Sequence, residues 1–143
     1  MMSVDSGAAV LETEGNNPKA ADKKKTKFDV IIIGAGPSGY TAGIYCSRAG
    51  YDTLILSGVL PGGQLVNTTE VENFPGFENG IMGPDLMIDM RKQSQRMGTT
   101  IVDDEVVDVD FRRKPLKVLT ASEEYEGRAV IIATGANPRK IGL

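Results

Sequence analysis

Apolar runs and a helical pattern alternate in the first ordered part of the chain. Residues 27–33, KFDVIII, are largely β-branched without polar alternation, which is typical of a parallel strand buried on both faces. Residues 37–50, PSGYTAGIYCSRAG, predict a helix with Pro37 in its first turn and Gly50 as its stop. Residues 52–57, DTLILS, predict a second short buried strand. Strand, helix and strand in succession indicate a βαβ unit.

A loop rich in glycine and proline, residues 58–83, follows this unit. It is longer than a structureless connection usually is, and long loops in compact domains commonly carry function. Residues 84–98 then predict an amphipathic helix whose apolar face packs on the core. That face carries Leu86, Met87, Met90 and Met97.

Three further segments have strand character: residues 100–111, 116–121 and 128–135, the first of them expected to break into two. They predict a small antiparallel β-meander. The fold class is therefore α/β, a Rossmann-like parallel sheet with flanking helices plus the meander. Residues 27–143 are assigned to this one domain. Residues 1–26 contain almost no large apolar side chain, so they predict a disordered tail.

The bulk composition narrows the classes of function. With 41% hydrophobic and 24% charged residues, the chain resembles a soluble globular protein. A net charge of only −3 gives no reason to expect nucleic acid or an anionic membrane as a partner. No apolar stretch approaches the ~20 residues of a membrane span. We expect a cytoplasmic protein.

Candidate groups for metal or redox chemistry are scarce. The chain has no histidine, and its single cysteine, Cys46, falls inside the first predicted helix and is interpreted as core packing. An acidic stretch lacks the spacing of a calcium loop and is interpreted as a solvated face, so no metal site and no catalytic residue are assigned. These acids are Asp103, Asp104, Glu105, Asp108 and Asp110.

The densest glycine pattern, Gly34-Ala35-Gly36-Pro37-Ser38-Gly39, lies between the first strand and the first helix. This is the setting that a dinucleotide-binding turn requires. Gly34 permits the tight turn, Gly36 lets a pyrophosphate approach the backbone, and Gly39 lets helix and strand pack closely. The N–H groups and the dipole at the helix start would face the phosphates.

The same pattern is incomplete for a nicotinamide cofactor. An NAD site usually carries an acid at the end of the second strand to hold the ribose, and no acid occurs from Thr53 to Thr69. An arginine suited to NADP is also absent near that point. We expect the long loop after Ser57 to provide the missing contacts.

Three separated motifs resemble the FAD domain of low-molecular-weight thioredoxin reductases. They are GAGPSGYTAGIYCSRAG at 34–50, GGQLVNTTEVENFPGF at 62–77 and ATGANPRKIGL at 133–143. Their order and distances match that family over residues 27–143. The resemblance implies that FAD is the cofactor and that the glycine-rich turn holds its pyrophosphate.

The resemblance also carries over a set of cofactor contacts, residue by residue. The loop glutamine and asparagine correspond to Gln64 and Asn73, and the strand valine near the adenine corresponds to Val106. Gly62 and Gly63 would let backbone N–H groups approach a flat ring, and Gln64 offers both a donor and an acceptor. The whole implied set is Gly34, Ala35, Gly36, Pro37, Ser38, Gly39, Gly62, Gly63, Gln64, Asn73, Val106, Thr134, Gly135 and Ala136.

A member of that family moves electrons from NADPH through FAD to a Cys-x-x-Cys pair and then to thioredoxin. Neither a second phosphate-binding turn nor a cysteine pair occurs in these residues, so we expect the first, incomplete portion of such a domain. The resemblance implies the activity only for the parent enzyme. Two alternatives stay open: a portion of a thioredoxin-reductase-like ferredoxin–NADP reductase, and a non-catalytic nucleotide-binding module. A homodimer is also left open.

Overall fold

The computed structural model describes residues 24–137, and the predicted tail, except for its last three residues, lies outside that range. So does the end of the third motif, residues 138–143. Within residues 24–137 the structure has eight strands, two α-helices and one 3₁₀ helix. In chain order they are β1 Lys27–Ile33, α1 Pro37–Arg48, β2 Thr53–Leu56, the 3₁₀ helix η1 Gly63–Asn67, β3 Glu70–Val71, β4 Ile81–Met82, α2 Gly83–Arg96, β5 Thr100–Val102, β6 Val106–Asp110, β7 Leu116–Thr120 and β8 Glu124–Ile132.

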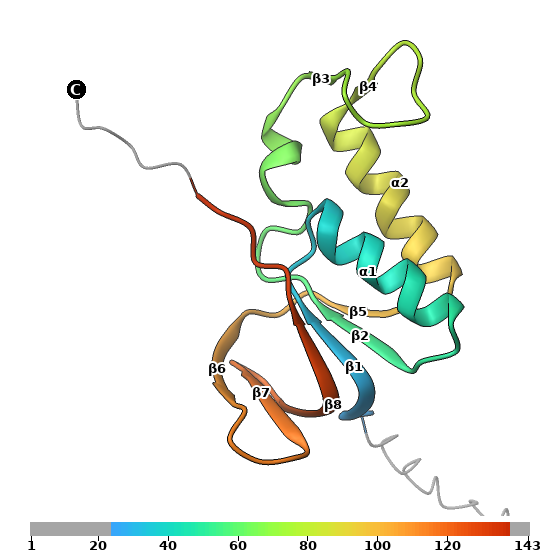
Figure 1. The fold of residues 1–143 in the computed structure, drawn as a ribbon. Coiled ribbons are helices and arrows are strands. Elements are labelled where there is room, and N and C mark those ends of the chain that lie inside the picture. The colour runs from blue at the N-terminus through green and yellow to red at the C-terminus, as the bar shows by residue number, and fades with distance from the viewer. Residues whose placement is uncertain (1–23, 138–143) are drawn as a thin grey trace, which may run out of the picture.

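Six strands form one mixed sheet in the order β5-β2-β1-β8-β7-β6. β1 pairs in parallel with β2 on one side and with β8 on the other, and β5 is parallel to β2. The β6, β7 and β8 strands are antiparallel neighbours. The α/β class with its meander is thus confirmed, with β8 shared by the parallel and the antiparallel parts (Figure 1).

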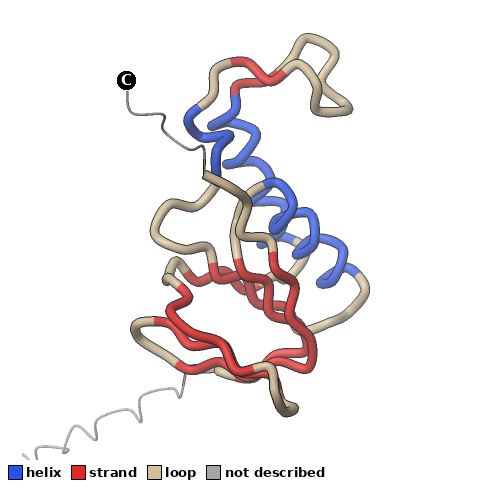
Figure 2. Tube along the Cα trace, turned by 60° about the vertical axis from the view of Figure 1, so that its left-hand side comes forward, coloured by secondary structure: helices blue, strands red, loops and turns tan. Residues whose placement is uncertain are grey.

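The two helices lie together on one face of the sheet, while the meander turns toward the other (Figures 1 and 2). Successive side chains of β2 pack alternately into the cores on the two faces of the sheet. Ile55 joins the core under the helices, whereas Leu54 and Leu56 join the core that includes Val118 and Tyr125 of the meander. The parallel strands are therefore buried on both faces, as their unbroken apolar runs predict.

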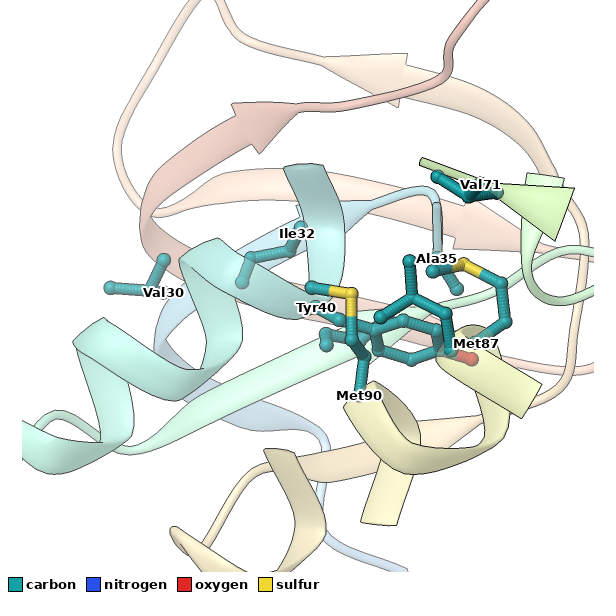
Figure 3. Packing of buried hydrophobic residues seen from close by; sticks show 9 residues of the cluster. Val30, Ile32, Ala35, Tyr40, Val71, Met87 and Met90 are labelled. Carbon is teal, nitrogen blue, oxygen red and sulfur yellow. The ribbon is translucent and has the colours of Figure 1, made fainter. Parts of the chain in front are cut away.

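The methionine-rich face of α2 packs as expected. Met87 and Met90 are buried against Tyr40 of α1, which is only 1% exposed (Figure 3). Leu86 is buried with them, and Met97 at the helix end is half-buried. Burying side chains of this size contributes about 1.5–3 kcal/mol each. This contact fixes α2 against α1.

The structure differs from the sequence expectations in three places. The loop 58–83 contains η1 and the two-stranded β3–β4 sheet, because these short elements carry no periodic signal. The predicted strand 100–111 divides as expected, but its first part, β5, joins the parallel strands instead of the meander. The last strand begins at Glu124, four residues before the predicted start, and so reaches back to pair with β7.

The residues just before β1 already contact the sheet. The Glu126 N–H donates to the Thr26 carbonyl at 2.8 Å, and Lys25 Nζ lies 2.5 Å from Asp52 Oδ2. Lys24 lies over the ring of Tyr125, 5.9 Å from its centroid. Residues 24–26 therefore contact the sheet, and the start of the domain at residue 27 stays a prediction.

Candidate functional site

The three glycines of the first turn are constrained by different neighbours. Gly34 has φ +110°, and a Cβ there would overlap the Ala133 carbonyl. A Cβ on Gly39 would overlap the Gly34 carbonyl, so the start of α1 lies directly against the end of β1. Gly36 has an ordinary φ of −83°, and a Cβ there would meet nothing within 4 Å. The fold requires a glycine at two of these positions, and the third leaves space for a ligand.

A cavity of about 250 Å³ opens beside Gly36. Three chain segments line it: the glycine-rich turn, residues between Ser57 and Leu65, and residues 133–135. These segments follow β1, β2 and β8, which run parallel to one another and end at the same edge of the sheet (Figure 1). The cavity therefore lies at the carboxyl ends of these strands. Open α/β sheets commonly bind ligands at that edge.

The start of α1 is arranged to receive an anion. Gly36 is its N-cap and makes no side-chain capping hydrogen bond, and no acid occupies the first turn. The first N–H groups of a helix have no partner within the helix. They and the positive end of the helix dipole favour a phosphate group at this point.

The Gly62–Gly63 pair holds the second wall of the cavity against the first. The Gly62 N–H donates to the Ala35 carbonyl at 2.8 Å. Gly63 has φ +62°, and a Cβ on it would lie 3.5 Å from the Gly36 Cα. Gln64 follows at the cavity edge, where its Nε2 donates to Asn137 Oδ1 at 3.0 Å. Two loops distant in sequence are thus connected across the cavity.

The third wall follows β8. The Ala133 N–H donates to the Ile33 carbonyl at 2.8 Å, so this segment continues beside the glycine-rich turn. Thr134 and Gly135 line the cavity, and Gly135 has φ +67° with open space around it. Ala136 follows them on the exposed surface, outside the cavity lining.

Several residues implied by the resemblance lie elsewhere. Asn73 lines a separate, shallow hollow formed by residues 72–78. Val106 begins β6 and packs on the core between the sheet and the meander. Gly62 borders a smaller hollow beside Tyr40, and Gly39 packs against the backbone. Their contact with a cofactor stays a prediction.

The cavity also includes residues that sequence reasoning did not assign: Ser57, Leu60, Leu65 and Ala133. Ser57 could have been found, because it stands at the predicted end of the second strand, the usual place of a ribose contact. Leu65 and Ala133 lie inside two of the motifs quoted above but were not assigned a contact, and Leu60 lies outside the motifs.

An ion pair lies directly behind Ser57. The Arg91 guanidinium of α2 donates to both carboxylate oxygens of Asp103 at 2.8 Å, and Ser57 Oγ donates to Asp103 Oδ1 at 2.6 Å. The Arg91 guanidinium, and then the Ser57 hydroxyl, hold the pKa of Asp103 below its usual range. Burial raises the pKa of the Tyr40 phenol, which also neighbours Arg91.

Asp103 thus belongs to a fixed network, while Asp104 and Asp110 have partners of their own. Asp110 pairs with Arg112 at 2.8 Å, and Asp104 accepts a hydrogen bond from Ser122. Within residues 24–137 no three potential metal ligands lie close enough together to hold an ion. Within the same range no helix has the length and apolar character needed to cross a membrane. Cys46 is half-buried against the core under the helices.

A Rossmann-like dinucleotide-binding domain is the class of protein that this fold and site define. The family model described as pyridine nucleotide-disulphide oxidoreductase matches residues 28–143, and the chain belongs to that family. It is 50% identical over 119 residues to a thioredoxin reductase of Buchnera aphidicola, covering 83% of this chain and 37% of the relative. A thioredoxin reductase of Streptomyces coelicolor is 51% identical over 117 residues, covering 80% and 36%.

Solved structures agree with these sequence relatives. A thioredoxin reductase from Giardia duodenalis superimposes with a TM-score of 0.78 at 37% identity, covering 82% of this chain and 38% of that one. The Lactococcus lactis thioredoxin reductase gives a TM-score of 0.75 at 41% identity, covering 80% and 37%. The resemblance inferred from the three motifs is confirmed. The chain spans less than two fifths of the length of these relatives.

Proposed function

We propose that this chain binds FAD in the cavity at the carboxyl ends of β1, β2 and β8, as the flavin-binding portion of an NADPH-dependent thioredoxin reductase. One observation carries the proposal. Gly36 has an unstrained backbone and a free space where its side chain would be, so the glycine serves something other than the fold. A pyrophosphate at the start of α1 explains it.

The other lining residues fit the same cofactor. The N–H groups at the start of α1 would bind the pyrophosphate, and the positive φ of Gly63 keeps that wall free of a side chain. Gln64 would direct its amide toward the ligand, and Thr134 with Gly135 would border it from the third wall. When bound, FAD supplies a two-electron carrier between a nicotinamide and a disulfide.

The relatives favour thioredoxin as the electron acceptor of the parent enzyme over ferredoxin–NADP exchange, because the matching proteins are named thioredoxin reductases. In that reaction electrons pass from NADPH through FAD to a cysteine pair and on to thioredoxin. Cys46 is the only cysteine of this sequence, so the cysteine pair of that reaction is not among these residues. Their role in the proposed reaction is to hold and orient the flavin. A cytoplasmic location and a homodimer complete the proposal, and one unpaired cysteine suits a reducing compartment.

The test compares FAD binding by the wild-type chain with binding by a variant in which a side chain fills the space at residue 36. Binding is followed by the change in flavin fluorescence, which lies in the visible, away from protein emission. We expect Gly36→Val to weaken binding at least about tenfold, equivalent to ~1.4 kcal/mol, because the new side chain fills the phosphate position. Thr41→Val, on the exposed side of α1, should bind like wild type. Equal binding by wild type and Gly36→Val would refute the site.

A further inference from the structure

The end of β2 is an unusual place to find a serine. Dinucleotide-binding folds commonly place an acid there to accept hydrogen bonds from the ribose hydroxyls, and this chain has no acid from Thr53 to Thr69. Ser57 lines the cavity instead and is only 7% exposed. A hydroxyl can take the place of a carboxylate only if its own hydrogen is directed away from the ligand.

The surroundings of Ser57 meet that condition. Its Oγ lies 2.6 Å from Asp103 Oδ1, 3.1 Å from the Gly58 carbonyl and 3.4 Å from the Val102 carbonyl. A serine has one hydrogen to donate, and an ionised carboxylate only accepts. The shortest and charge-assisted bond takes that hydrogen. The Oγ therefore keeps its lone pairs for a donor in the cavity.

Asp103 is itself held in place. Arg91 binds both of its oxygens from α2, a fork geometry that fixes the carboxylate plane. The backbone ties the two strand ends together, since the Ser57 N–H donates to the Val102 carbonyl at 3.0 Å and the Gly58 N–H to the Asp104 carbonyl at 3.1 Å. The acid missing from the end of β2 is thus present one strand away, after β5, behind the serine.

We propose that Ser57 Oγ accepts a hydrogen bond from a ribose hydroxyl of the adenosine half of the dinucleotide, and that Asp103 is the positioning residue that makes it an acceptor. This inference rests on the proposed FAD site and names the residues that recognise its ribose. A purely structural Ser57–Asp103 bond would join β2 to β5 without discriminating among sugars. A role in ribose binding therefore predicts that affinity depends on the ribose hydroxyls, whereas a purely structural role predicts that it does not.

The experiment measures the affinity of the chain for ADP and for 2′,3′-dideoxy-ADP by calorimetry. Wild type should prefer ADP by about three- to tenfold, the effect of one net hydrogen bond. In Ser57→Ala the preference should disappear, with affinity for the dideoxy ligand unchanged. Ser57→Thr, which keeps the hydroxyl, should retain it.

Asp103→Asn provides the second test. Arg91 needs an acceptor, so the amide oxygen should turn to it and the amide NH₂ to Ser57 Oγ, where it occupies one of the two lone pairs that are free in wild type. The preference for ADP should fall as in Ser57→Ala. The control is Asp110→Asn, an acid paired with Arg112 at the end of β6, which should behave like wild type.

Each outcome decides between the claims. Equal weakening of both ligands in Ser57→Ala, or an unchanged preference in Ser57→Ala or Asp103→Asn, overturns the ribose role and leaves the FAD site standing if Gly36→Val still abolishes ADP binding. Failure of wild type to bind ADP, or binding that Gly36→Val does not alter, overturns the proposed function and this inference together.

Discussion

At the scale of the residue, glycines three positions apart have opposite surroundings. Gly36 has a free space and an ordinary backbone, whereas Gly39 is pressed against the Gly34 carbonyl. The spacing of glycines in the sequence predicts both residues, but their separate roles follow only from the neighbours that the fold provides. The same substitution at both positions can therefore distinguish a glycine needed for packing from one that is not.

We expect Gly39→Ala to destabilise the protein and Gly36→Ala to leave stability nearly unchanged. A methyl group on Gly39 forces the start of α1 away from β1, a backbone distortion of the kind that costs about 2–4 kcal/mol. A methyl group on Gly36 enters open space. Urea unfolding followed by circular dichroism gives both free energies. Similar losses in the two variants would contradict the assignment of roles.

At the scale of the element, apolar runs predicted β1 and β2, and boundary residues and periodicity predicted both helices. The runs at 27–33 and 52–57 became β1 and β2, and the face of α2 packs as its periodicity predicts. The partners of β5 and β8 were not predictable, because pairing depends on contacts between segments far apart in the chain. The connection from α2 to Asp103 was missed for the same reason.

Of the candidate site, the glycine turn could be placed from its strand-to-helix setting, whereas Gln64 and residues 134–135 were carried over by the resemblance. Those residues border one cavity. Leu60 was missed because a leucine in a loop carries no pattern of its own, whereas the position of Ser57 at the end of the second strand could have indicated it. Asn73 and Val106, carried over by resemblance, lie away from that cavity.

The Arg91–Asp103 contact between α2 and the end of β5 makes stability depend on pH. Because Arg91 lowers the pKa of folded Asp103, the contribution is complete above the usual aspartate pKa of about 3.9 and is lost as the pH falls through the lower folded value. Asp103 is half exposed, so the effect is small. Unfolding free energies measured from neutral to acid pH should fall less steeply in Asp103→Asn. In an Arg91→Gln background the same substitution should change the slope much less, and an equal change there would contradict this origin.

At the scale of the whole molecule, the chain combines one glycine-rich turn between a strand and a helix, Gly34–Gly39, with one cysteine. Reduction of a disulfide by thiol exchange requires an attacking thiolate and a second thiol that resolves the mixed disulfide. We propose that the cavity beside that turn binds one dinucleotide, FAD. We therefore propose that these 143 residues bind the flavin and do not themselves reduce the disulfide.

We expect the 143-residue chain to show no thioredoxin reduction when mixed with FAD, NADPH and thioredoxin. Release of thiols can be followed with a chromogenic disulfide against a blank without protein. Turnover clearly above that blank, and lost in Gly36→Val, would mean that these residues catalyse the complete reaction. A full-length relative in the same assay serves as the positive control.

The central claim is that a dinucleotide binds at the carboxyl ends of β1, β2 and β8. Its most direct test is a titration of the ¹⁵N-labelled chain with FAD, followed by amide chemical shifts. The account predicts that the largest changes fall on Ala35, Gly36 and Ser38, with further changes at Gly63 and Thr134. Changes centred on the hollow at residues 72–78, or no changes at the glycine-rich turn, would contradict it.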